Sequence, residues 1–130
     1  MWTLAARLGP GDDLRGGLLD LAGSAAWRAG WVATCVGSLS RVELRLAGQA
    51  GASVWEGDFE IVSLVGTLSP AGAHLHLAVA DGGGRTIGGH LRGGCVVRTT
   101  AEVVLAVTDE LGFGRAADPT TGYDELVVEP

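Results

Sequence analysis

The chain has 130 residues and a formal net charge of −6, and hydrophobic residues make up 47% of it. This length is ordinary for one domain with its own core, and the charge is too low and too mixed for a disordered chain. All nine basic residues are arginines, which excludes a Schiff-base lysine and the lysine of a phosphate-binding P-loop. The acidic balance also argues against strong phosphate-backbone binding, which depends on basic patches.

The chain shows no sign of a membrane span or a leader. No apolar run approaches the roughly 18 residues needed to cross a bilayer, and Met1–Arg7 lacks the charged start and long apolar stretch of a signal peptide. We therefore expect a single soluble domain over residues 1–130, located in the cytoplasm. Cys35 and Cys95 lie in separate apolar stretches without a CxxC motif, so we expect two buried free thiols.

The first half of the chain changes between extended and helical patterns. One helix is predicted, capped by Asp12 or Asp13 and running to about Trp27, with Gly30 ending it. The extended patterns predict strands at 3–8, 31–38 and 42–46, with a turn at Ser40-Arg41 between the last two.

The second half predicts a series of strands joined by short turns. Asp81 is expected to form an Asx-type turn, and the tail from Phe113 to Leu126 is expected to be largely loop, with a further strand at 125–128. The extended runs predict strands at 58–68, 74–80, 86–92 and 99–108. One main helix with about seven strands on short turns predicts an α+β fold with a mostly antiparallel sheet.

The three histidines of the chain are predicted to converge on one face of a hairpin. Alternation along a strand puts His74 and His76 on the same side of the sheet. An odd turn centred on Gly83 places His90 directly opposite His76, with Cβ atoms about 4.5–5.5 Å apart. An even turn would move His90 to the other face. The odd register also collects the apolar residues on the opposite face: Leu75, Leu77, Val79, Ile87 and Leu91.

Three neutral imidazoles with an open fourth position are the usual ligand set of a catalytic zinc ion. Zinc in such a site lowers the pKa of a bound water or polarises a carbonyl group. We therefore predict that His74, His76 and His90 bind a divalent metal, with zinc as the expected ion. The alternative is a surface or interface cluster of histidines without metal.

Two charged residues are candidates for catalytic roles beside the metal. Glu60 is a candidate acid, base or fourth ligand, but alternation puts it on the other face unless a bulge or a neighbouring subunit brings it in. Arg92 is predicted to share the histidine face, where its guanidinium could hold a small anionic ligand. The alternatives are an exposed or paired carboxylate for Glu60 and an ion pair for Arg92.

Several motifs of the chain resemble the PPC (plants and prokaryotes conserved) domain family. Together they cover nearly the whole chain: Asp12–Leu14, Val36–Leu39, Gly57–Leu68, Gly72–His76, Gly88–Leu91, Gly94–Val97, Thr100–Val104 and Thr121–Leu126. The resemblance implies an α+β fold that assembles as a homotrimer, and the histidines resemble the stand-alone prokaryotic form. The fold is also similar to that of acetolactate decarboxylase, which holds zinc through three histidines on strands; that likeness covers fold and metal, not reaction.

The resemblance also brings an expectation of DNA binding. In plants the domain follows an AT-hook, which binds the minor groove, whereas this chain has no Arg-Gly-Arg-Pro and its nearest string is Arg15-Gly16-Gly17. Two functions are therefore predicted. The first is a metal-dependent enzyme or small-anion binder at the histidines, and the alternative is a DNA-binding or regulatory interaction module without catalytic activity.

Overall fold

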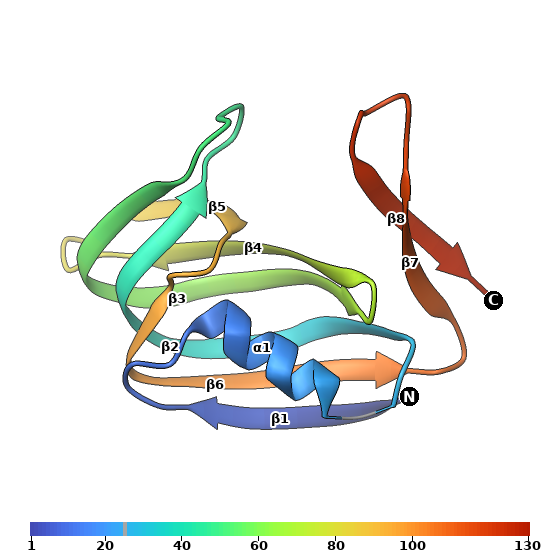
Figure 1. Ribbon diagram of the computed structural model, residues 1–130. Coiled ribbons are helices and arrows are strands. Elements are labelled where there is room, and N and C mark those ends of the chain that lie inside the picture. The colour runs from blue at the N-terminus through green and yellow to red at the C-terminus, as the bar shows by residue number, and fades with distance from the viewer. Residues whose placement is uncertain (25) are drawn as a thin grey trace.

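The computed structural model describes residues 1–24 and 26–130. They form a mostly antiparallel β-sheet with one short helix, consistent with the α+β class (Figure 1). None of the helical segments described is both long and apolar enough to cross a membrane. In chain order the elements are β1 (Trp2–Leu8), α1 (Leu14–Gly23), β2 (Ala29–Arg45), β3 (Ser53–Ser69), β4 (Gly72–Ala80), β5 (Thr86–Leu91), β6 (Val96–Thr108), β7 (Gly112–Ala117) and β8 (Asp124–Glu129).

The main sheet curls back on itself. Its six strands have the order β1-β6-β2-β3-β4-β5, and the end of β2 also pairs with β5, where Leu44 lies opposite Leu91 and Arg45 opposite His90. The curled strands enclose a core of leucines and valines, and α1 covers this inner face with Leu14 and Leu18, both fully buried. The outer face of β4 and β5 carries the histidines.

Helix α1 begins at the aspartates, as predicted. The Asp13 carboxylate accepts a hydrogen bond from the Gly16 backbone N–H at 2.8 Å, so Asp13 rather than Asp12 is the N-cap. The other oxygen of Asp13 accepts from the Gly94 N–H at 2.6 Å. The cap therefore also ties the helix to the loop before β6.

The predicted end of the helix is wrong. Helix α1 ends at Gly23, and Gly30 lies within β2; the predicted continuation through Ala25 lies outside the described residues. Trp27 is buried, and its indole N–H donates to the Ala22 carbonyl at 2.6 Å. The indole of Trp27 thus takes the place of the backbone N–H that would bond the Ala22 carbonyl if the helix continued.

The predicted turn at Ser40-Arg41 is also wrong. Strand β2 continues through these residues, with a β-bulge between Leu39 and Arg41 in its pairing with both neighbours. A bulge adds one residue to a strand and breaks its alternation without ending it. In a single sequence, a break in the alternation of apolar and polar residues looks the same whether a bulge or a turn causes it.

The C-terminal tail is a hairpin rather than a loop. Strands β7 and β8 pair from Gly112 opposite Glu129 to Ala117 opposite Asp124, and they stand apart from the main sheet in Figure 1. The predicted strand at 125–128 is confirmed within β8. The Asp-Pro and Thr-Gly pairs that suggested a long loop occupy only the connection, where Gly122 has φ 79°.

Both cysteines are free thiols, as predicted, although only Cys95 is fully buried and Cys35 is half-buried. Burial raises the pKa of Cys35 to about 11, and burial likewise raises the pKa of Cys95 to about 11. Both therefore stay protonated at neutral pH and are poor nucleophiles and poor metal ligands.

Candidate metal centre

The hairpin of β4 and β5 has the odd register that the sequence predicts. His76 lies opposite His90, and the apolar stripe at Leu75, Leu77 and Val79 is buried on the inner face. The loop is held by Asp81, whose carboxylate accepts hydrogen bonds from the backbone N–H groups of Gly83 and Arg85, each at 2.9 Å. This local turn fixes the register and with it the face on which His90 projects.

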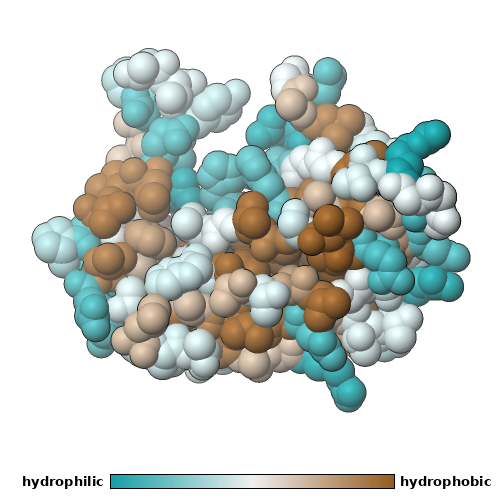
Figure 2. Space-filling model, turned by 180° about the vertical axis from the view of Figure 1, so that it is seen from behind, coloured by the Kyte–Doolittle hydropathy of each residue, from teal (hydrophilic) through white to brown (hydrophobic). Residues whose placement is uncertain are grey.

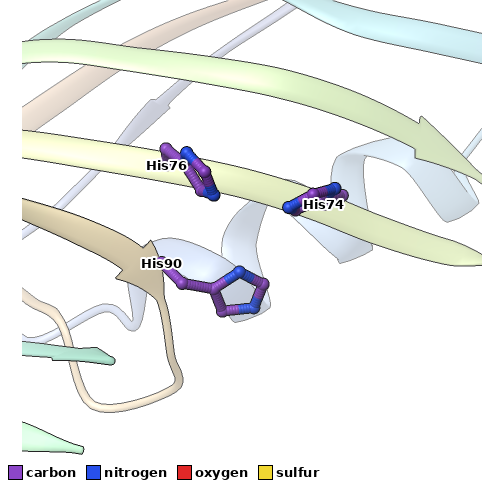
Figure 3. Close-up of side chains that lie close together, drawn as sticks. All are labelled: His74, His76 and His90. Carbon is purple, nitrogen blue, oxygen red and sulfur yellow. The ribbon is translucent and has the colours of Figure 1, made fainter. Parts of the chain in front are cut away.

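The three imidazoles lie close together on the outer face, as Figure 3 shows. Their ring centroids are 5.0 Å apart for His74 and His76, 5.4 Å for His74 and His90, and 5.8 Å for His76 and His90. One ligand nitrogen from each ring lies within 4.8 Å of the other two. His74 and His76 are exposed and His90 is half-buried, so the cluster is accessible from solvent.

The surroundings of two of these rings favour their neutral form. Burial, then the neighbouring His76 and Arg115, lower the pKa of His74 below its ordinary value. Burial, then Arg45 and the other histidines, lower the pKa of His90. Neutral imidazole is the form that binds a metal, because a protonated ring has no free nitrogen lone pair.

The residues present fit a zinc ion. Zinc–nitrogen bonds of about 2.0–2.1 Å bring ligand nitrogens to roughly 3.3 Å from one another, so small side-chain rotations would close the cluster. Nδ1 of His90 is buried and has no hydrogen-bond partner among the described residues. Buried polar atoms normally have one, and a bound metal or its ligand would supply it.

A pocket of about 370 Å³ opens beside the cluster. His74 and His90 form part of its wall, together with Arg45 from the end of β2 and Arg115 from β7. Tyr123, which precedes β8, and the first two residues of β8, Asp124 and Glu125, also line the pocket. Figure 2 shows a hollow lined by hydrophilic residues between the two projecting parts of the molecule.

Glu60 reaches the histidine face in the way that the sequence analysis required. A bulge between Ile61 and Ser63 shifts the pairing of β3 with β4, so Glu60 lies opposite Ala80. Ala80 is four residues from His76 along β4, a separation of roughly 13 Å at the rise of an extended strand. Glu60 is exposed and does not line the pocket beside the histidines.

Arg92 lies next to the site but outside the pocket. It follows the last residue of β5, its side chain is exposed, and its backbone N–H donates to the Glu43 carbonyl at 3.3 Å. The arginines that line the pocket are Arg45 and Arg115, which the sequence analysis did not select. Neither residue carries a local signal, because each is brought to the histidines by a distant pairing.

The fold defined here, a curled antiparallel sheet with one short helix, is shared with solved structures. A hypothetical protein from Salmonella enterica is 44% identical, with a TM-score of 0.95 over 98% of this chain and 93% of that one. The metal-containing protein AF0104 from Archaeoglobus fulgidus is 22% identical, with a TM-score of 0.82 over 98% and 94%. A "putative dna binding protein" from Bacteroides thetaiotaomicron is 18% identical, with a TM-score of 0.85 over 96% and 91%.

Residues 1–109 match the model of the Plants and Prokaryotes Conserved (PCC) domain. The chain belongs to this family, as its motifs predict. A relative in sequence is the bifunctional protein GlmU of Synechococcus sp. (strain JA-2-3B'a(2-13)), 52% identical over 124 residues and 95% of this chain. The chain spans about a fifth of the length of that protein, 20%. Strands β7 and β8 lie beyond the residues that the family model matches.

Proposed function

We propose that this chain is a metal-binding protein of the cytoplasm, in which His74, His76 and His90 hold a divalent ion, expected to be zinc. The observation that carries the proposal is the convergence of one nitrogen from each ring within 4.8 Å. Two of the three histidines, His74 and His90, line a pocket of a size suited to a small ligand. Both features suit a metal-dependent enzyme or a binder of small anions.

The expected chemistry follows from the ligand set. A zinc ion with three imidazole ligands supplies a Lewis acid for a water or a substrate oxygen in its remaining position. The residues of the chain would hold the ion, lower the pKa values of His74 and His90 and shape the pocket. The sequence predicts Glu60 for proton transfer and Arg92 for orienting an anion. Both side chains are exposed, so each residue can be substituted at little cost to the stability of the fold.

Metal content tests this proposal directly. Protein purified without a His tag should contain about one zinc ion per chain by elemental analysis, and stripped protein should take it up again in a calorimetric titration at about pH 7.5. Uptake should weaken toward about pH 5, because protons compete for the ring nitrogens once the pH falls below the histidine pKa values. The lowered pKa values of His74 and His90 extend binding to lower pH than ordinary histidines would allow. Protein that neither contains nor takes up a divalent ion would refute the proposal.

We also propose that the chain assembles as a homotrimer, as its family resemblance implies. Three valines on the outer face of the central strands support an interface there: Val36, Val62 and Val65 are 55%, 57% and 55% exposed. Hydrophobic surface is also visible across the middle of Figure 2. Large apolar side chains grouped on a sheet face are typical of a surface that another chain covers. Val65 lies opposite His76, so such an interface would border the metal site.

Mass measurement in solution tests the trimer. Sedimentation equilibrium should return three times the chain mass of 13.2 kDa. A Val36→Glu, Val65→Glu double variant should be monomeric, because it would bury two carboxylates without partners. Val54→Glu, at the other end of β3, is the control and should leave the mass unchanged. A monomeric wild-type chain, or a double variant that remains trimeric, would exclude this interface.

A DNA-binding module is the second candidate. It is supported by the similarity in fold to the "putative dna binding protein" from Bacteroides thetaiotaomicron, which is 18% identical. The charge opposes it, since fifteen acidic residues outnumber nine arginines and phosphate-backbone binding needs a basic surface. Metal-free protein that still shifts duplex DNA at low salt would favour this candidate.

A further inference from the structure

Two arginines stand on either side of the histidine cluster. Arg45 ends β2 and lies opposite His90, because the sheet curls and β2 pairs with β5. Arg115 projects from β7 and donates a hydrogen bond to the Thr67 hydroxyl at 3.3 Å, and Thr67 lies opposite His74. Opposed residues on neighbouring strands project from the same face. Across that face the order is therefore Arg45, the three histidines, then Arg115.

Neither guanidinium forms an ion pair with a carboxylate of the described residues. The hydrogen bonds of Arg45 are limited there to one long contact of 3.5 Å with the Gln49 carbonyl, and Arg115 bonds Thr67. Both side chains are half-buried. Arginine has five N–H donors, so each guanidinium keeps donors free toward the pocket.

A metal bound to the histidines would make the pocket positively charged. Asp124 and Glu125 line the same pocket and balance the two arginines, so with neutral imidazoles the pocket alone has no net charge. A divalent ion on the histidines adds two positive charges, and a bound ion is often the largest local charge in a site. The loaded pocket therefore attracts an anion, whereas the metal-free pocket does not.

We propose that Arg45 and Arg115 are the anion-binding residues of this pocket and that its ligand is a small oxyanion, a carboxylate or a phosphate, held between the metal and the two guanidiniums. This inference rests on the proposed metal site. It replaces Arg92 as the anion-binding residue, because Arg92 is exposed outside the pocket. It also gives a role to β7, which lies beyond the residues matched by the family model.

The chemistry of guanidinium supports this assignment. Its planar fork matches the two oxygens of a carboxylate or a phosphate, and such charge-assisted hydrogen bonds are the stronger ones. The pocket also restricts the size of the ligand, because it holds only about 370 Å³. That volume lies toward the lower end of ligand pockets.

Anion titration of the zinc-loaded protein tests the proposal. Stoichiometrically loaded protein, freed of excess zinc, is titrated by calorimetry with inorganic phosphate and separately with lactate. The anion that binds more tightly shows whether the pocket prefers a phosphate or a carboxylate. At least one should bind, and metal-free protein should bind neither. Arg45→Gln and Arg115→Gln should each weaken binding by about tenfold or more, the loss of one charge-assisted contact.

Two matched variants and one internal check make the outcome decisive. Arg85→Gln, in the exposed β4–β5 turn, removes the same charge outside the pocket and should change nothing, and Arg92→Gln should change binding less than about threefold. Arg45→Gln and Arg115→Gln should bind zinc at least as tightly as wild type, because each removes a positive charge beside the cation. A misfolded variant would lose zinc binding together with anion binding.

The possible failures can be told apart. Absence of zinc uptake by the wild type refutes the proposed metal site and this inference with it. Zinc uptake without binding of either anion refutes only the inference. An Arg92→Gln variant that weakens binding as much as Arg45→Gln and Arg115→Gln would return the anion-binding role to Arg92.

Discussion

His76→Ala should lower the affinity for zinc by more than about 100-fold. Even groups that merely support a metal ligand are worth 10–100-fold in affinity, so removing one of three direct ligands should exceed about that range. The stability cost should be small, because His76 is exposed on the outer face of β4. Calorimetric zinc titration of the stripped variant measures the loss, and circular dichroism checks that the fold is retained.

The control for His76→Ala is Thr86→Ala, an exposed position on the same face of the hairpin, near its turn. It should bind zinc as wild type does. His74→Ala and His90→Ala should lower the zinc affinity as much as His76→Ala does, because each removes one of the three direct ligands. Tight zinc binding by all three variants would show that the metal, if bound, lies elsewhere.

Gly66→Ala should destabilise the fold by roughly 3 kcal/mol or more. Gly66 has φ 144°, a backbone conformation that L residues rarely adopt, and a Cβ at this position would lie 2.0 Å from the His74 carbonyl oxygen. Neither the carbonyl nor the neighbouring backbone can move without opening the β3–β4 ladder. Urea unfolding followed by circular dichroism measures the change.

The matched control is Gly82→Ala, in the β4–β5 turn, where an added Cβ would meet nothing within 4 Å. It should change the free energy of unfolding by no more than about 0.5 kcal/mol. Gly66 lies opposite Leu75, between the two histidines of β4. The variant should therefore also weaken zinc binding if it folds, and a Gly66→Ala protein as stable as the control would contradict the close approach of these strands.

The hairpin that carries the histidines could be predicted because its information is local. Alternation assigns faces within each strand, and Asp81 with its glycines sets an odd turn. The buried stripe then selects one register, since any shift by one residue would expose it. The same reasoning failed at Ser40-Arg41 and at the helix end. At Ser40-Arg41 a bulge lets the strand continue past a break in its alternation, and at the helix end a buried tryptophan indole bonds the Ala22 carbonyl. Residue type alone reveals neither.

The sequence by itself determined the antiparallel sheet, the family and the convergence of His74, His76 and His90. Only the tertiary structure decided which charged residues join them. The curl of the sheet brought Arg45 beside His90, and the β7–β8 hairpin placed Arg115 on Thr67. The bulge in β3 turned Glu60 to the histidine face but left it opposite Ala80, outside the pocket. The physical reason is range: side-chain alternation acts between neighbours along one strand, whereas these contacts join distant strands and depend on how the whole sheet bends.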